Sequence, residues 1–310
     1  MSAPEWAAEL EDRLGGPLDG IHLVPGGASK EAWAVEVAGE RLIVRRAGVS
    51  VIHEGALSLE HEFAMLEAAA DAGVKVPRPV AYLGLIGGRE AFAMARVDGE
   101  TIGRRIVRQP PPSLEHALAE ELAKVHSIAA ERVPFLGAGD ILDRFAGELE
   151  SVGEPHPALE FGLRWLRENR PEPLPDLVAH GDFRIGNVVV SERGLLAILD
   201  WEFAHLADPR EDLAWPLVRA WRFGADARRL GGVGEVAPYL GRYRELTARD
   251  VAEADLMWWE ILGNLKWGVG TLTQARRHLN GLDRSVELAV LGRLSAEMEY
   301  ELLDLIERAA

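Results

Sequence analysis

The sequence predicts an α+β protein of two lobes, the first built on a five-stranded antiparallel sheet and the second mainly helical. Before residue 98, short apolar runs end at glycines and prolines, a pattern typical of strands joined by tight turns. After it, apolar residues recur at helical spacing over long stretches. With 310 residues, 48% of them hydrophobic, the chain can bury a core in each part. We therefore expect a first lobe over 1–97 and a second over 98–310.

The first lobe is expected to contain a short helix, five strands and one longer helix. The short helix ends near Leu14, because Gly15, Gly16 and Pro17 follow it. The expected strands cover residues 21–24, 32–37, 41–46, 76–80 and 90–96, and the longer helix covers 55–72.

A glycine-rich loop over 25–30 separates the first two strands. Backbone N–H groups exposed by its glycines, together with the Ser29 hydroxyl, are suited to binding phosphate oxygens. The loop matches neither the Walker pattern nor the glycine-rich kinase pattern, so an ordinary hairpin turn explains it equally well. Ser29 is therefore a candidate nucleotide contact, and the alternative is that it belongs to an ordinary hairpin turn.

The second lobe is expected to be a succession of helices. They cover residues 114–128, 140–149, 159–168, 208–221, 250–278 and 286–309. His126 lies near the end of the first of them, where a buried structural histidine is a better interpretation than a ligand.

The stretch around which the chain is organised lies between these helices, from His180 to Asn187. Two apolar runs follow it, over 188–190 and 195–199, separated by a polar turn, and they predict a β-hairpin. The hairpin holds Asn187 at the entry of one strand and Asp200 at the exit of the other. An amide oxygen and a carboxylate can then converge on one hard cation such as Mg²⁺, with Asp182 beside it.

Phosphoryl transfer requires this set of groups: metal ions to neutralise phosphate oxygens, and a carboxylate to accept the proton of the attacking hydroxyl. The spacing from Asp182 to Asn187 is five, 187 minus 182, as in the catalytic loop of protein kinases. A metal-binding aspartate at the end of a downstream hairpin is shared as well, here Asp200.

The content of these motifs resembles the aminoglycoside phosphotransferase (APH) family. The resemblance is carried by His180-Gly181-Asp182 with Asn187, by Ile-Leu-Asp-Trp-Glu over 198–202, and by Asp-Pro-Arg-Glu-Asp-Leu-Ala over 208–214. Within the family, the branch fused to or encoded beside acyl-CoA dehydrogenases is the most similar. The resemblance covers about 18–220 and implies a protein-kinase-like fold, Mg²⁺ as cofactor, and ATP or GTP as phosphate donor.

The resemblance also implies roles for the motif residues. Asp182 would orient or deprotonate the acceptor hydroxyl, and Asn187 and Asp200 would hold Mg²⁺. His180 would fix the loop backbone without transferring protons. Asp212 would either accept hydrogen bonds from the backbone of that loop or serve only as an acid in the first turn of a helix.

In the first lobe, the resemblance assigns the nucleotide contacts. Arg45 stands where the family carries a phosphate-binding lysine. Glu62 stands where the helical partner of that lysine is expected, with Glu60 as the competing choice. If Arg45 does not contact phosphate, Lys30 is the next candidate. The crossing between lobes, from Met94 to Val97, would meet the edge of the base.

Composition excludes several other classes of protein. The net charge of −16 and the lack of a basic stripe argue against a nucleic-acid partner. The acidic surplus would suit a cationic acceptor, although general solubility explains it more simply. No cysteine is present, so disulfides and thiolate metal sites are excluded. No apolar run is long enough to span a membrane and no signal peptide is evident, so we expect a soluble, cytoplasmic protein.

These observations predict a kinase that phosphorylates a hydroxyl of a small molecule, such as an aminoglycoside-like, hydroxyacyl or amino-alcohol acceptor. The alternative is a non-catalytic nucleotide- or metabolite-binding module, which Arg45 in place of lysine and the unusual glycine loop would support. A protein kinase fits less well, because the run from Asp200 to Asp212 is too short for an activation segment.

Overall fold

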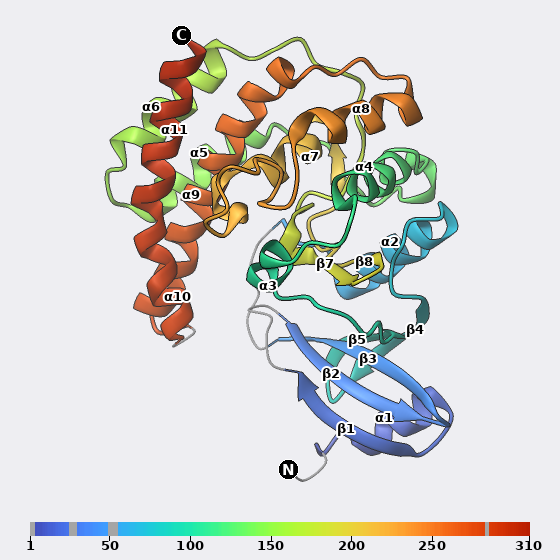
Figure 1. The fold of residues 1–310 in the computed structure, drawn as a ribbon. Helices are drawn as coiled ribbons and strands as arrows, with labels where there is room; N and C mark the ends of the chain where they lie inside the picture. Colours follow the sequence, from blue (N-terminus) through green and yellow to red (C-terminus); the bar gives the residue numbers. More distant parts are fainter. Residues whose placement is uncertain (1–3, 25–29, 49–54, 283–284) are drawn as a thin grey trace.

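The chain folds into two lobes, a sheet lobe and a larger helical lobe, as Figure 1 shows for the computed structural model. The structure describes residues 4–24, 30–48, 55–282 and 285–310. The predicted α+β class and the kinase-like arrangement of a five-stranded sheet followed by helices are confirmed. Ser29 lies outside the described residues.

The sheet lobe is antiparallel throughout, with strand order β1-β2-β3-β5-β4. Its elements are α1 (Ala7–Leu14), β1 (Leu18–Val24), β2 (Lys30–Val37), β3 (Glu40–Ala47), α2 (Leu59–Asp71), β4 (Pro79–Ile86) and β5 (Arg89–Ala95). Successive side chains of β5 point to opposite faces of the sheet. Ala91 and Ala93 pack in the core that includes Leu10 of α1. Phe92 packs in the core that includes Phe63 of α2. The two helices therefore contribute to cores on opposite faces of the sheet.

The predicted strand over 76–80 was wrong in position. Residues 76–78 are not in a strand, and β4 begins at Pro79 and continues to Ile86. Pro77 and Pro79 both lack a backbone N–H, so this segment cannot contribute a full set of ladder hydrogen bonds. Proline is tolerated at the first residue of a strand, where Pro79 stands.

The second lobe holds nine α-helices among its described residues, together with two small antiparallel pairs of strands. The helices are α3 (Gly103–Arg108), α4 (Leu114–Val125), α5 (Ile141–Val152), α6 (Pro157–Glu168), α7 (Arg210–Ala214), α8 (Val236–Thr247), α9 (Met257–Leu279), α10 (Val286–Leu291) and α11 (Ser295–Ala309). The strand pairs are β6 (Leu177–Ala179) with β9 (His205–Ala207), and β7 (Val188–Ser191) with β8 (Gly194–Ile198). The core around α9 packs Ile261 and Leu265 against Leu159 of α6 and Leu302 of α11.

Three predicted helices of this lobe were wrong in extent. The helix predicted over 250–278 begins only at Met257, and the one predicted over 286–309 is interrupted by a 3₁₀ turn over Gly292–Leu294. Residues 208–221 do not form one helix: α7 ends at Ala214, and two short 3₁₀ turns follow, over Trp215–Leu217 and Arg219–Arg222. Pro216 lacks the N–H that an α-helix would need at this point and clashes with the preceding turn. Helices α3 and α8 were not predicted.

The two lobes meet where the chain leaves β5 and passes the β7–β8 hairpin. The N–H of Glu100 donates to the carbonyl of Val190 at 2.8 Å, and the N–H of Val190 donates back at 3.0 Å. At Gly99, a Cβ would lie 2.6 Å from both a Val189 methyl group and the Val190 carbonyl oxygen, so only glycine fits without a shift. This contact seats the hairpin directly under the connection between the lobes.

No helix in the described part of the chain is both long and apolar enough to cross a bilayer.

Candidate active site

The β7–β8 hairpin brings Asn187 and Asp200 together as the sequence predicts. Val188 pairs with Ile198, and the N–H of Leu199 donates to the carbonyl of Asn187 at 2.8 Å. Asp200 follows directly, with its backbone in the left-handed region at φ 61°. Aspartate tolerates this conformation better than most residues, and such strain is common at functional sites. The turn there directs the chain away from the hairpin.

Asn187 is also bonded to Asp182. Its Nδ2 donates to Asp182 Oδ2 at 2.6 Å and to the Asp182 carbonyl at 3.0 Å. Because both bonds use the amide nitrogen, the Asn187 Oδ1 is the atom left for a cation. The predicted relation between Asp182 and Asn187, five residues apart, is thus a direct contact.

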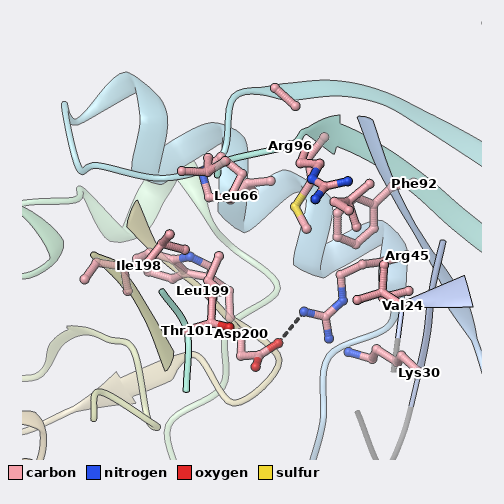
Figure 2. Close-up of a pocket in the computed structure, with 18 of the residues that line it drawn as sticks. Val24, Lys30, Arg45, Leu66, Phe92, Arg96, Thr101, Ile198, Leu199 and Asp200 are labelled. Carbon is pink, nitrogen blue, oxygen red and sulfur yellow. Dashed lines mark hydrogen bonds and ion pairs between the residues drawn. The ribbon is translucent and has the colours of Figure 1, made fainter. Parts of the chain in front are cut away.

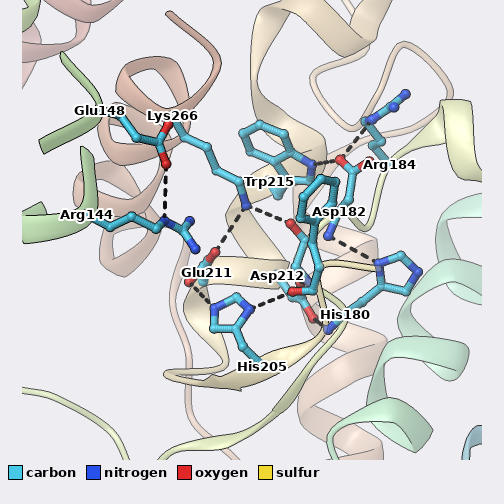
Figure 3. Close-up of polar contacts among 12 residues, drawn as sticks. Arg144, Glu148, His180, Asp182, Arg184, His205, Glu211, Asp212, Trp215 and Lys266 are labelled. Carbon is cyan, nitrogen blue, oxygen red and sulfur yellow. Dashed lines mark hydrogen bonds and ion pairs between the residues drawn. The ribbon is translucent and has the colours of Figure 1, made fainter. Parts of the chain in front are cut away.

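The other oxygen of Asp182 is held by two further donors (Figure 3). Arg184 Nε lies 2.9 Å from Asp182 Oδ1, and Trp215 Nε1 lies 2.7 Å from the same atom. The Trp215 ring is buried, and the ammonium group of Lys266 lies over it, 4.4 Å from the ring centroid. The carboxylate is therefore fixed by neighbours on both of its oxygens.

Asp212 binds the backbone of the catalytic loop, as one of its two predicted interpretations requires. Its carboxylate is fully buried and accepts the N–H of His180 at 2.6 Å and the N–H of Gly181 at 2.9 Å. His126, buried as expected, lies 3.4 Å from the same carboxylate. Burial alone would raise the pKa of Asp212, but the hydrogen bonds from His126 and from the backbone N–H of His180 contribute to lowering that pKa. Asp212 thus stays ionised and holds the loop.

His180 supports the same loop from its other side. Its Nε2 lies 3.0 Å from the carbonyl of Leu199, and its Nδ1 lies 3.2 Å from the N–H of Asp182. One nitrogen donates and the other accepts, so these contacts require the neutral ring. Burial lowers the pKa of His180, in agreement with that state. The ring joins the loop to the hairpin, as its predicted structural role requires.

Gly181 and Lys266 complete the loop. Gly181 has φ +77°, and a Cβ there would collide with the carbonyl oxygen of Phe203. Lys266 on α9 donates to the carbonyl of Gly181 at 2.6 Å and lies 3.3 Å from Glu211. Glu211 is also bonded to His205 at 3.2 Å (Figure 3).

On the opposite side of the hairpin, five charged side chains form a cluster between the lobes, which we call the phosphate-side cluster: Lys30, Arg45, Glu62, Asp200 and Glu202. Arg45 forms an ion pair with Asp200 (Figure 2). Arg45 Nη1 also lies 3.4 Å from Glu62 Oε1. Lys30 forms an ion pair with Glu62 and another with Glu202, the latter at 2.9 Å.

Charge pairing sets the ionisation of this cluster. Partial burial disfavours the charged form of Asp200, but the positive charge of Arg45 outweighs this effect and lowers the pKa of that carboxyl. Burial likewise opposes the charge of Arg45, yet Glu62 and Asp200 raise its pKa. Both groups are therefore charged at neutral pH.

A cavity of about 470 Å³ opens beside this cluster, between the sheet and the hairpin (Figure 2). Its walls are largely apolar, with side chains that include Ile43, Leu66, Phe92, Val189 and Leu199. The charged residues Lys30, Arg45, Glu62 and Asp200 line it as well, and so do Met94 and Val97 of the predicted hinge. A cavity of this size, with an apolar part and a charged end, has the character of a small-molecule site.

The donor set near Asp200 fits Mg²⁺ held partly by a ligand. The described residues contain no cluster of three or more acidic or histidine side chains that could hold a metal alone. Mg²⁺ is typically bound in nucleotide sites by one or two protein oxygens with phosphate oxygens and water. The free Oδ1 of Asn187 and the carboxylate of Asp200, whose side chain is 40% exposed, match that requirement.

Sequence reasoning missed several residues that the structure places at the site. Trp215 and Lys266 contact the loop over 180–187, and Glu202 is a member of the phosphate-side cluster. Glu202 stands two residues after Asp200 in the Ile-Leu-Asp-Trp-Glu motif over 198–202, so the sequence contained a signal for its place near the site. Trp215 and Lys266 reach the loop through the tertiary packing of the second lobe, which no local pattern reveals.

Comparison with known protein families gives one match over most of the chain. The model of the phosphotransferase enzyme family, APH, matches residues 20–246. Two curated relatives are acyl-CoA dehydrogenase family member 10 of Mus musculus, 27% identical over 78% of this chain, and family member 11 of Gallus gallus, 25% identical over 61% of this chain. Each match covers 26% of the relative, so the chain corresponds to about a quarter of those longer proteins.

Solved structures of similar fold cover nearly the whole chain. A proposed aminoglycoside phosphotransferase from Ralstonia eutropha has a TM-score of 0.75 and 20% identity, covering 97% of this chain and 98% of its own. Spectinomycin phosphotransferase APH(9)-Ia, in complex with ADP and spectinomycin, has a TM-score of 0.69 and 12% identity, with the same coverage. Aminoglycoside 2'-phosphotransferase-IIIa, in complex with GDP, has a TM-score of 0.67 and 14% identity over 96% of this chain and 97% of its own.

Proposed function

Because this chain belongs to the phosphotransferase enzyme family, we propose that it transfers the γ-phosphate of a nucleoside triphosphate to a hydroxyl group of a small molecule. The observation that carries the proposal is the convergence of Asp182, Asn187 and Asp200 on one loop and hairpin, with Asp200 lining a cavity of about 470 Å³. We further propose that residues 1–97 and 98–310 act as the nucleotide-binding lobe and the acceptor-binding lobe.

In this proposal the nucleotide occupies the cavity with its base at the hinge. Met94 and Val97 line the cavity where the chain crosses between the lobes, so they are suited to contact the base. Arg45, paired with Glu62, lies toward the charged end and would bind phosphate oxygens. Asn187 and Asp200 would hold Mg²⁺, which supplies positive charge to the phosphates in such reactions.

Asp182 would act on the acceptor. A carboxylate that is fixed by donors on both oxygens is well placed to orient a hydroxyl and to accept its proton. The hydroxyl oxygen forms a bond to the γ-phosphorus while the bond to the β-phosphate oxygen breaks. The products are a phosphate monoester and a nucleoside diphosphate, with the proton on Asp182.

The donor is ATP or GTP. Similar structures include one complex with ADP and one with GDP, so the fold accommodates either purine. We take ATP as the first donor to test and GTP as the second.

The charges around Asp182 bear on the acceptor. Arg184 lies 2.9 Å from the carboxylate, and Lys266 contacts the backbone of the adjacent Gly181. Each of these cations is already paired with a carboxylate, Arg184 with Asp182 and Lys266 with Glu211, so the local charge does not disfavour a cationic acceptor. We rank hydroxyacyl compounds before amino alcohols and aminoglycosides because of the similarity to acyl-CoA dehydrogenase family members.

The rival function is a binding module that retains the fold without catalysis. Arg45 in place of a lysine is the feature that favours it. The intact set of Asp182, Asn187 and Asp200 favours an enzyme, because binding alone does not require a proton acceptor.

The experiment is a phosphorylation screen with γ-labelled ATP and GTP in the presence of Mg²⁺. The acceptors are hydroxyacyl-CoA thioesters and hydroxy acids, amino alcohols, and aminoglycosides, each incubated with the wild type and with Asp182→Asn. Label transferred by the wild type and not by Asp182→Asn supports the proposal. Nucleotide binding without transfer to any acceptor, and without Mg²⁺-dependent hydrolysis, would favour the binding module.

A further inference from the structure

Lys30 and Arg45 project from neighbouring strands onto the same face of the sheet. Ala32 on β2 is paired in register with Arg45 on β3, and Lys30 lies two residues before Ala32. Side chains two residues apart on a strand share a face, so Lys30 is a diagonal neighbour of Arg45. Both line the cavity, and Figure 2 shows both side chains reaching toward Asp200.

Glu62 of α2 is held more closely by Lys30 than by Arg45. The Lys30 ammonium forms an ion pair with Glu62 Oε2, whereas Arg45 Nη1 is 3.4 Å from Glu62 Oε1. The shortest ion pair of Arg45 is with Asp200 instead. The Glu62 side chain is only 3% exposed, and a carboxylate buried to this extent requires a close cation.

The cation that pairs with the helix glutamate has a defined role in kinase-like sites. There, an ion pair between a strand lysine and a helix glutamate positions the lysine on the phosphates of the nucleotide. In this chain the closest partner of the helix glutamate is a lysine, but it stands on β2 and not on β3.

We propose that Lys30 binds the nucleotide phosphates and takes the place of the usual β3 lysine, with Arg45 as a second cation beside Asp200. The inference rests on the proposed function and names a further residue of the same site. An ammonium group has three donors on a flexible stem, so Lys30 can keep Glu62 and exchange Glu202 for a phosphate oxygen.

The charges of the phosphate-side cluster support this assignment. Two cations, Lys30 and Arg45, face three carboxylates, those of Glu62, Asp200 and Glu202, which gives a net charge of −1. Without Lys30 the net charge is −2, and a polyphosphate would be repelled more strongly. Removal of Lys30 should therefore weaken binding of the phosphates and leave binding of the nucleoside unchanged.

The first test compares Lys30→Met with Lys124→Met. Lys124 lies on α4 and also pairs with a glutamate, Glu121, at 2.8 Å, so the same substitution there controls for loss of an ion pair. Calorimetry measures the affinity for Mg·ATP and for adenosine. We expect Lys30→Met to lose about 10- to 100-fold in ATP affinity, the size of a lost charge-assisted hydrogen bond, with adenosine unchanged. Lys124→Met should match the wild type for both ligands.

The second test uses the wild type and does not depend on a variant that folds. An acyl phosphate of ATP acylates a lysine whose Nζ lies next to the phosphates, because the amine attacks the acyl carbonyl and ATP leaves. The chain has four lysines, Lys30, Lys75, Lys124 and Lys266, so peptide mass spectrometry can assign the product. We expect acylation of Lys30 that excess Mg·ATP suppresses.

The inference is overturned if the wild type binds Mg·ATP while Lys30→Met binds it as Lys124→Met does, or if nucleotide-suppressible acylation occurs at another lysine. Equal losses of ATP and adenosine affinity in Lys30→Met would also overturn it, since they indicate a structural role. A wild type that binds no Mg·ATP at all would instead overturn the proposed function, and this inference with it.

Discussion

The two sides of the candidate site are held together by different interactions. On one side, the phosphate-side cluster consists of ion pairs between side chains of both lobes, and it pairs Arg45 with Asp200. On the other side, the loop over 180–187 is held by hydrogen bonds from its backbone to the buried Asp212 and by the His180 ring, which contacts the carbonyl of Leu199. One side depends on charges that a ligand competes for, and the other depends on bonds that a ligand does not touch.

This difference indicates which side of the candidate site we expect to change when a nucleotide binds. In the proposed function, Asp200 binds Mg²⁺ with both carboxylate oxygens only if its ion pair with Arg45 opens or is shared. A phosphate group can then replace the carboxylate as the partner of Arg45. The catalytic loop needs no such exchange, because its backbone is already fixed around Asp182. We expect preorganisation on the catalytic side and re-pairing on the nucleotide side.

The largest effect is expected from Asp182→Asn, which removes the proton acceptor from the preorganised side. We predict a loss in turnover of about 10³-fold, in the range that general base catalysis contributes. The affinity for Mg·ATP should stay close to that of the wild type, since Asn187 and Asp200 remain. Steady-state kinetics and calorimetry give the two values. Turnover near the wild-type rate would show that another group accepts the proton or that none is needed.

The next largest effect is expected on stability, from Asp212→Asn. The substitution places an amide NH₂ or a neutral oxygen against two backbone donors, the N–H groups of His180 and Gly181, in a fully buried place. We predict a decrease of about 3 kcal/mol in the free energy of unfolding, as for other broken buried networks.

Denaturant titration measures this decrease, and Asp226→Asn is the matched control. Asp226 pairs with Arg219 on the surface with its side chain 42% exposed, so its substitution should cost less than about 1 kcal/mol. Equal losses in the two variants would contradict the view that Asp212 anchors the loop.

A smaller effect is expected from Trp215→Phe, which removes the indole N–H that Asp182 accepts at 2.7 Å. We predict about a tenfold decrease in kcat with little change in the KM for nucleotide, because the carboxylate loses one of the groups that orient it. In an Asp182→Ala background, the same substitution should have little further effect on residual turnover.

Trp267→Phe is the control for that variant. Trp267 packs against the same aromatic cluster, and its buried Nε1 has no hydrogen-bond partner among the described residues. The substitution therefore removes an indole N–H that reaches no part of the loop. Equal decreases in kcat for the two variants would indicate a packing effect and would sink the positioning role of Trp215.

The smallest effect concerns pH and the pair of His205 and Glu211, which supports Lys266 beside the loop. Burial disfavours the charged His205, but Glu211 outweighs burial and raises the pKa of His205. A raised pKa stabilises the fold below about pH 6.5, the unfolded value, and this contribution is lost as pH rises through the folded pKa.

The measurement is the difference in free energy of unfolding between the wild type and His205→Gln, taken between pH 5.5 and 9. We predict that the wild-type advantage is at most about 1 kcal/mol and shrinks as pH rises. An advantage that grows with pH would contradict the assignment.

Local sequence patterns predicted the parts of the candidate site that depend on structure formed by neighbouring residues. A β-hairpin is a local structure, so its two apolar runs and polar turn were sufficient to bring Asn187 next to Asp200. Short motifs also predicted the strands of the first lobe, except for the position of β4, and the contact of Asp212 with the loop was one of the two interpretations that the sequence left open.

The remainder depends on contacts that are distant along the chain. Trp215 and Lys266 reach the loop only because α9 packs against the turns after α7. Lys30 was a secondary candidate, and its pairing with Glu62 depends on the register of β2 against β3, which local periodicity does not specify. The break after α7 is the converse case, because Pro216 is a local sequence signal that is sufficient to end an α-helix.

The measurement that tests the account most directly is calorimetric titration of nucleotide, with and without Mg²⁺, into the wild type, Asp182→Asn and Asp200→Ala. The account predicts Mg²⁺-dependent binding to the wild type, the same binding to Asp182→Asn, and loss of the Mg²⁺ dependence in Asp200→Ala, because only Asn187 then remains to hold the cation. Equal affinities with and without Mg²⁺ in the wild type, or unchanged Mg²⁺ dependence in Asp200→Ala, would contradict it.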